Sequence, residues 1–284
     1  MQTTLHRYRA GMPQLGYTGL AENWLLKECG HRHWEALAAH AGRDAPDFVD
    51  DRGRRAYAAF VAIRVVLPAP SAIEENDAFE IALTLRRVGA IRHTSEQRIV
   101  RGGVEVGSVT MLSTFVTRER AGSNRSVARA RFAALGGAPD EAGTLPDALA
   151  ALAARGRALR ERDPAAVPPW ARPLATVDAG PIEAAEFLPC PNNDFNGADL
   201  LYFASFQAFV DRAEWQRHRF ARPPALVSRS LHFHGNLDVG DTLRVQPLAE
   251  RRDGARLRHW CELVRGADGM KIADVITEKT WEGA

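Results

Sequence analysis

The sequence predicts an α+β protein built from two copies of one structural unit. Three observations lead to this expectation. A Pro-x5-Gly segment occurs twice, at residues 13–19 and 191–197. Each copy is followed by an apolar pattern of helical spacing, and each helical pattern is followed by segments in which apolar residues alternate. The two copies agree in order and in spacing, which argues against a chance similarity.

A long, largely buried helix is expected after each glycine turn, at Gly19 and at Gly197. In the first copy, the apolar residues at roughly helical spacing are Leu20, Trp24, Leu25, Trp34 and Leu37. In the second copy, they are Leu200, Leu201, Phe203, Phe206, Phe209 and Trp215.

Antiparallel strands are expected after each helix, because apolar and polar residues then alternate. The alternating residues are Phe79, Ile81, Leu83 and Leu85 in the first copy, and Leu231, Phe233, Leu243 and Val245 in the second. Asp77 and Asp241 precede corresponding strands, and a Val-Arg-Gly turn follows each aspartate at the same distance along the chain. A closing strand is expected from Gly107 in one copy and from Met270 in the other.

The segment between the copies has a different composition, rich in alanine, arginine and proline. Within it, residues 145–162 are expected to form one helix that ends before Asp163-Pro164, and residues 167–173 a stiff proline-rich connector. The sequence therefore predicts an N-terminal domain at 1–117, a linker with one helix at 118–185, and a C-terminal domain at 186–284.

Composition excludes several classes of protein. The chain has 284 residues, and its 37 basic and 35 acidic side chains leave a net charge of +2, so nucleic-acid binding through bulk charge is not expected. No apolar run is long enough for a membrane span, and the first residues do not look like a secretory signal, so we expect a cytoplasmic protein with no membrane partner. Cys29, Cys190 and Cys261 have no CxxC spacing, and neither a disulfide framework nor a metal site is expected.

Two long helices, each wrapped by an antiparallel sheet in one chain, resemble the double hotdog fold. The segment YFASFQAFVDRAEW, residues 202–215, is similar to the helix of 4-hydroxybenzoyl-CoA-type thioesterases, in which an aspartate and a glycine precede an aromatic-rich helix. Asp194 and Gly197 supply that pair here. Residues 11–34, AYAAF at 56–60 and DFNGADLLYFASF at 194–206 together resemble the LnmK-type bifunctional acyltransferase/decarboxylase family of leinamycin biosynthesis, which is itself a double hotdog.

This resemblance implies an activity and a set of partners. In that family the enzyme takes a methylmalonyl group from CoA onto a tyrosine, removes carbon dioxide and delivers propionyl to an acyl carrier protein in polyketide biosynthesis. The matching tyrosine is Tyr57. No cofactor is implied, because CoA and the phosphopantetheine of the carrier protein only carry the substrate. Two alternatives to this nucleophilic role are open. Tyr57 either donates a hydrogen bond to the thioester carbonyl, or it is a buried strand residue that only packs.

Loss of carbon dioxide from a malonyl-type thioester requires hydrogen-bond donors around the enolate oxygen. The backbone amides that follow Gly19 and Gly197 are candidate donors, because the first amides of a helix lack partners within it. Asn193 and Asn196 add neutral side-chain donors. The alternative is that Asn193, Asp194 and Asn196 only form a turn and a helix cap, and the two roles are compatible.

Asp194 leaves two interpretations open. Its carboxylate either activates water, which would make the protein a thioesterase, or caps the helix and orients Asn196. His232 and His234 share one face of a strand without a third metal ligand, and His234 is the one expected to line the pocket. Arg125 and Arg129 belong to a basic stretch that either holds phosphates of the substrate carrier or forms a solvated surface.

The sequence thus predicts an acyl-thioester site where the two helices and their sheets meet. The expected activity is acyl transfer coupled to decarboxylation of malonyl-CoA or methylmalonyl-CoA, with an acyl carrier protein as acceptor. The alternatives are an acyl-CoA or acyl-carrier-protein thioesterase that uses Asp194, and a non-catalytic module that binds acyl carrier protein. The sequence leaves open whether monomers pair into a homodimer.

Overall fold

The two predicted units are joined edge to edge in one large antiparallel sheet. The computed structural model describes residues 3–133, 135–136, 146–172 and 182–281. The strand order of the sheet is β1-β6-β7-β8-β5-β11-β14-β13-β12-β10, with β9 paired to β8 and β4 to β5. Outward from the β5–β11 pair, β8, β7, β6 and β1 on one side correspond to β14, β13, β12 and β10 on the other. The two halves are therefore related by a pseudo-twofold axis at this pair.

The elements of the N-terminal half are β1 (Thr3–Arg9), β2 (Leu15–Gly16), β3 (Gly19–Leu20), α1 (Glu22–His40), β4 (Phe48–Val49), β5 (Arg55–Val66), the 3-10 turn η1 (Pro70–Ala72), β6 (Ala78–Arg87), β7 (Arg92–Arg101) and β8 (Val104–Arg118). Between the halves lie η2 (Asn124–Ser126), β9 (Val127–Arg129), α2 (Asp147–Arg160) and η3 (Pro164–Ala166). The C-terminal half contains β10 (Ala185–Phe187), α3 (Pro191–Asp194), α4 (Phe203–His218), β11 (Ala225–Phe233), β12 (Leu243–Asp253), β13 (Arg256–Arg265) and β14 (Lys271–Thr280).

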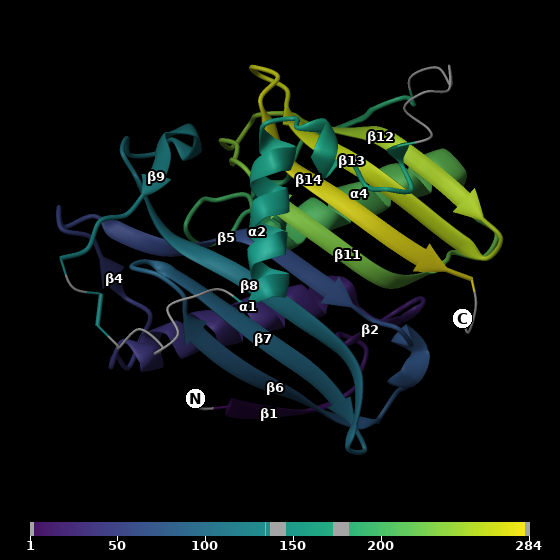
Figure 1. Cartoon of the computed structure of the whole chain (residues 1–284), viewed down its shortest axis with the longest axis horizontal. Coiled ribbons are helices and arrows are strands. Elements are labelled where there is room, and N and C mark those ends of the chain that lie inside the picture. Colours follow the sequence, from purple (N-terminus) through teal and green to yellow (C-terminus); the bar gives the residue numbers. More distant parts are fainter. Residues whose placement is uncertain (1–2, 134, 137–145, 173–181, 282–284) are drawn as a thin grey trace.

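Helices cover both faces of the sheet. The helices α1 and α4 lie on one face, which we call the inner face, and contact each other. The helix α2 crosses the opposite, outer face over the seam between the halves and contacts β5 and β14 (Figure 1). The helix expected at residues 145–162 is thus observed as α2, although Leu145 lies outside the described residues. The domain boundaries at residues 118 and 185 stay a prediction.

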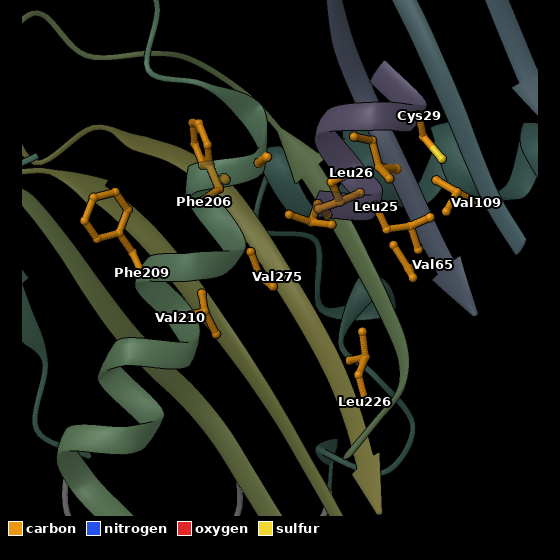
Figure 2. Close-up of a cluster of buried hydrophobic side chains, with 14 of the residues drawn as sticks. Leu25, Leu26, Cys29, Val65, Val109, Phe206, Phe209, Val210, Leu226 and Val275 are labelled. Atoms are coloured by element: carbon orange, nitrogen blue, oxygen red, sulfur yellow. The ribbon is translucent and has the colours of Figure 1, made fainter. Parts of the chain in front are cut away.

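One continuous apolar core fills the space between the inner face and the two long helices. Figure 2 shows its central part, with Leu25, Leu26 and Cys29 of α1 beside Val65 and Val109, and Phe206, Phe209 and Val210 of α4 beside Val275. The alternating residues Phe79, Ile81 and Leu83 are all buried, as the period-two pattern predicted. The prediction for Trp215 was wrong, because this side chain near the end of α4 is 51% exposed.

The turns before corresponding strands confirm the repeat at the level of single atoms. Asp77 accepts a hydrogen bond from the backbone amide of Glu74 at 2.7 Å, and Asp241 accepts one from the amide of Asp238 at 2.9 Å. In both turns, the aspartate side chain accepts a hydrogen bond from the backbone amide three residues earlier. The two halves therefore share local geometry as well as strand order.

Candidate functional site

The start of α4 is built around Asp194, the last residue of α3. Asp194 is buried, and its Oδ2 accepts a hydrogen bond from the amide of Cys190 at 2.8 Å. Its backbone carbonyl accepts hydrogen bonds from the amide of Tyr202 and the hydroxyl of Ser205, which ties α3 to the first turn of α4. The other carboxylate oxygen, Oδ1, accepts no hydrogen bond from any described residue.

Asn196 closes the loop that leads into α4. Its side-chain oxygen accepts hydrogen bonds from the amides of Ala198 at 3.0 Å and Leu200 at 3.1 Å, so the turn role considered for this residue is present. Its Nδ2 group donates to none of the described residues. Asn193 and Gly197 are exposed neighbours, and the Nδ2 of Asn193 lies 3.5 Å from the Sγ of Cys190.

Both halves hold this loop in place. Arg118 at the end of β8 donates to the carbonyl of Ala198, and Asn124 donates to the carbonyls of Asp199 and Leu237. Asn124 is buried and accepts from Arg118 in return. Because buried, multiply bonded amides are costly to displace, the loop has a fixed position at the seam between the halves.

An aromatic layer lies beside the loop, where α1 and α4 cross. The ring of Phe203 packs edge-on against Phe60 and Tyr202, with ring centroids 4.6 and 4.7 Å away. Phe203 also lies so close to Gly30 that a Cβ atom there would be 2.4 Å from the ring. Burial, together with Glu28, raises the pKa of Tyr202, so its phenol is a neutral donor near neutral pH.

The two glycine turns do not share a pocket, which corrects the expectation that their amides converge on one oxygen. Gly19 has a φ of +115° and packs against the carbonyl of Pro70, after the end of β5. The loop after Gly197 contacts Arg118, next to the start of β5. The two turns are thus separated by about the length of that strand, roughly 35 Å.

The amides after Gly197 are also not the free helix amides that the sequence suggested. The helix α4 begins only at Phe203. The amides of Ala198, Leu200 and Leu201 donate to the side chains of Asn196 and Asn236. These backbone donors are already used, whereas the side-chain amide of Asn196 has no partner among the described residues.

Tyr57 lies at the same end of β5 as the loop but projects from the outer face. It pairs with Val116, and directly paired residues of two strands share a face. Phe60, which packs on the inner-face helix, pairs with Ser113. The register shifts between Phe60 and Ala62, and this bulge moves Tyr57 to the face opposite Ile63. The Tyr57 hydroxyl bonds to neither Asp194 nor Asn196 in the described residues.

The remaining candidates have structural partners or lie apart from the loop. His234 bonds through Nε2 to Asp274 at 2.8 Å on the outer face. Arg125 forms ion pairs with Asp238 and Asp241, which satisfies its charge locally. Arg129 is exposed on β9. Among the described residues, no three His, Cys, Asp or Glu side chains lie close enough together to hold a metal ion.

Sequence reasoning missed a largely buried charge cluster that joins the two halves, formed by Glu22, Asp211, Glu214, Arg229, His259 and Lys279. Only the side chain of Asp211, 40% exposed, reaches the surface. Arg229 of β11 donates to Glu22 of α1 and to Asp211 of α4, each at 2.6 Å. Lys279 bonds Asp211 and Glu214, and Glu214 bonds His259. Desolvation raises the pKa of Glu22 to about 7, against the attraction of Arg229. These residues are far apart in the sequence, and no local pattern marks them.

In the N-terminal half, the position under α1 that corresponds to Glu214 and His259 under α4 is occupied by three neutral side chains. His33 lies between Ser95 and Ser113, at 2.7 and 2.8 Å from their hydroxyls. Burial lowers the pKa of His33 to about 3, so the ring is neutral at physiological pH. With both ring nitrogens bonded and no carboxylate partner, His33 stabilises the packing of α1 on the sheet.

Comparisons with known proteins give the fold. No protein-family model matches the chain, and no curated protein sequence matches it. A 12:0-ACP thioesterase from Umbellularia californica is similar in structure, with a TM-score of 0.64 at 12% identity, over 98% of this chain and 96% of that one. An acyl-ACP thioesterase from Bacteroides thetaiotaomicron has a TM-score of 0.57 at 8% identity, over 98% and 97% of the two chains.

The fold is a double hotdog. Two hotdog units side by side account for the pseudo-twofold sheet, with α1 and α4 as their two central helices. At these identities the likeness extends to the fold alone. In the part of the chain that the structure describes, none of the helices has the length and hydropathy of a membrane span.

Proposed function

We propose that this double hotdog protein is an enzyme that acts on an acyl thioester of CoA or acyl carrier protein at the start of α4. The observation that carries the proposal is the Asp194–Asn196 pair. Two residues apart, one carboxylate oxygen and one amide donor have no partner among the described residues, while the rest of each side chain is fixed by hydrogen bonds. Preorganised polar groups of this kind are what acyl transfer requires.

Hydrolysis is the reaction that this pair supports best. The carboxylate of Asp194 would take a proton from water as the water oxygen bonds to the thioester carbonyl carbon. The Nδ2 of Asn196 would donate to the carbonyl oxygen as it becomes an oxyanion. Collapse of that intermediate breaks the C–S bond, and the departing thiolate takes the proton from Asp194. The thioesterase names of the similar structures agree with this class of reaction.

Decarboxylating acyl transfer is the second candidate, and the resemblance to the LnmK-type family favours it. In this reading Asn196 would donate to the enolate left after loss of carbon dioxide from methylmalonyl-CoA, and propionyl would pass to an acyl carrier protein. Tyr57 is at the same end of β5 as the loop, which favours a role near the substrate. Its outer-face position argues against direct attack by Tyr57 on a thioester held at Asn196.

Product analysis separates these activities. The protein is incubated with acyl-CoA, malonyl-CoA and methylmalonyl-CoA, and small molecules and intact protein are followed by mass spectrometry. Free acid identifies hydrolysis. Carbon dioxide with a propionyl adduct on the protein identifies decarboxylating transfer. If neither these CoA thioesters nor the same acyl groups on carrier protein are turned over, the enzymatic proposal is wrong and a carrier-protein binding module is the remaining reading.

Two nearly isosteric variants test the pair without removing its structural bonds. Asp194→Asn keeps an acceptor for Cys190 and removes the base. Asn196→Asp keeps the acceptor for the Ala198 and Leu200 amides and removes the donor. Each is expected to lower turnover by about 10²-fold or more with an unchanged melting temperature. Asn192→Ala, at an exposed neighbour, is the matched control. A loss below about threefold in both variants contradicts the assignment.

A further inference from the structure

A cavity lies on the outer face, on the side of the sheet opposite the α4 loop. Its volume is about 320 Å³, and its lining comes from the first turns of α2 and from the strands β5, β6, β7 and β8. Its polar lining consists of Arg64, Thr84, Arg86, Thr94, Glu96 and Thr110. The mechanism proposed above uses none of these residues.

Strand register explains why these side chains converge. Arg64 pairs with Thr110, Thr110 with Glu96, and Glu96 with Thr84 in one row across four strands. Arg86 and Thr94 form a pair in the adjacent row. Directly paired residues project from the same face, so both rows point toward α2.

Several donors in this cavity are unused. Arg64 is exposed at the cavity mouth and Arg86 is partly buried, and their guanidinium groups form no ion pair or hydrogen bond with any described residue. Thr94 is 3% exposed, and its Oγ1 has no partner at all among the described residues. A buried hydroxyl without a partner is costly, so a ligand in the cavity that accepted its hydrogen bond would offset this cost.

Several cations on the same face of the C-terminal half are paired instead. Arg258 binds Glu278, and Lys271 binds both Glu262 and Asp274. The exposed Arg244 of β12 has no partner among the described residues, so what distinguishes the N-terminal half is that two such arginines line one cavity.

The electrostatics of the cavity favour an anion. The helix α2 begins at Asp147 and has no side-chain cap, so its first amides and its positive dipole end lie at the cavity wall formed by Pro146, Ala148 and Leu149. Arg155, about two turns into α2, has its pKa lowered by burial and, to a smaller extent, by the nearby charge of Arg64. Glu96 at the exposed rim and Asp147 offset this charge only in part.

We propose that this cavity binds a phosphate group through Arg64, Arg86 and the hydroxyl of Thr94. Guanidinium forks match phosphate oxygens, and donors that come from three strands and a helix start surround a tetrahedral anion better than a planar carboxylate. The cavity is larger than an inorganic phosphate ion, so it has room for a phosphate ester as well as for the free ion. The site is separate from the thioester site and does not depend on the proposed function.

The test is binding of inorganic phosphate, CoA and acetate to the full-length protein at constant ionic strength, by titration calorimetry and by the shift in melting temperature. Saturable binding of inorganic phosphate or CoA, with no binding of acetate, is expected. Because CoA also carries the proposed substrate of the thioester site, only CoA binding that the Arg64→Met and Arg86→Met double variant loses is assigned to this cavity. Binding of CoA there that is tighter than that of phosphate identifies an ester as the source of the phosphate, and equal binding identifies the free ion. Absence of saturable binding by both overturns the proposal.

Variants locate the site. Arg64→Met combined with Arg86→Met should weaken phosphate binding at least about tenfold, because charge-assisted hydrogen bonds are the strong ones. Thr94→Val should weaken it roughly threefold. Arg244→Met, at an exposed arginine of β12, is the charge-matched control and should change nothing. If the double variant folds poorly, the threonine variant decides. Wild-type affinity in either the double or the threonine variant overturns the assignment.

Discussion

Replacement of Glu22 by glutamine isolates the titration of one buried carboxyl group. In the buried charge cluster, the cations Arg229 and Lys279 face three carboxylates. His259 and Lys279 outweigh burial and lower the pKa of Glu214 to about 2, whereas burial raises the pKa of Glu22 to about 7. With Glu22 protonated the cluster has no net charge, and ionisation adds one uncompensated negative charge to the core.

The sign of the pH effect follows from the proton balance. The ordinary pKa of glutamate is 4.5 and that of folded Glu22 about 7, so the folded state binds the extra proton between these values. Stability is therefore highest below the unfolded pKa and is lost as pH rises through the folded one. Between about pH 5.5 and pH 8 the free energy of unfolding should fall by roughly 2 kcal/mol, at 1.36 kcal/mol per unit. Glutamine keeps the bond to Arg229 and removes this slope.

Urea unfolding of wild type and Glu22→Gln across this pH range is the assay. The difference in unfolding free energy between the two proteins should change by roughly 2 kcal/mol in favour of the variant toward high pH. Glu80→Gln, at a partly exposed carboxylate on β6, controls for the loss of one negative charge. Parallel stability curves for wild type and Glu22→Gln would show that Glu22 is ionised throughout, and the argument from the cluster's charge would fail.

Four further substitutions test the packing, the loop and Tyr57. Gly30→Ala should destabilise the fold by about 1–3 kcal/mol in thermal unfolding, because the new methyl group meets the ring of Phe203. At Gly197 no atom lies within 4 Å of an added Cβ atom, so Gly197→Ala should change the unfolding free energy by less than about 0.5 kcal/mol. Equal effects at both glycines would contradict this packing argument. Asn124→Ala should cost about 2 kcal/mol in urea unfolding, since the buried carbonyl of Leu237 and the partly buried carbonyl of Asp199 lose their donor, and a neutral result would mean that water replaces it. Tyr57→Phe should leave stability and hydrolysis unchanged, while a loss of acyl transfer measured by mass spectrometry would favour the second candidate over hydrolysis.

Much of the fold followed from patterns along the chain. The spacing of Leu25 and Leu37 predicted the buried side of α1, and alternation at Phe79 and Ile81 predicted a strand with one face in the core. These predictions succeeded because the spacing of apolar residues along a helix or strand indicates which of its sides is buried. The correspondence of Asp77 with Asp241 before matching strands also followed from sequence, whereas the hydrogen bonds that close their turns were seen only in the structure.

Features that depend on contacts across the sheet were not predictable in this way. Strict alternation from Ile63 would place Tyr57 on the inner face, and the single extra residue at the bulge reverses this. The separation of Gly19 and Gly197 depends on the pairing of β5 with β11, which no local pattern reveals. Asp194 and Asn196 were identified from their position before an aromatic-rich helix, but their unused atoms became visible only with their partners in place.

The fusion of the two units in one chain has a consequence for how the protein can diverge. When two identical subunits pair, every substitution appears on both sides of the axis at once. Here Gly30 meets Phe203 on one side of the helix crossing, while Arg229 bridges Glu22 and Asp211 on the other. A single polypeptide can thus keep an ion-pair network at one of these positions, while the position related to it by the pseudo-twofold axis is free to evolve toward a new chemistry.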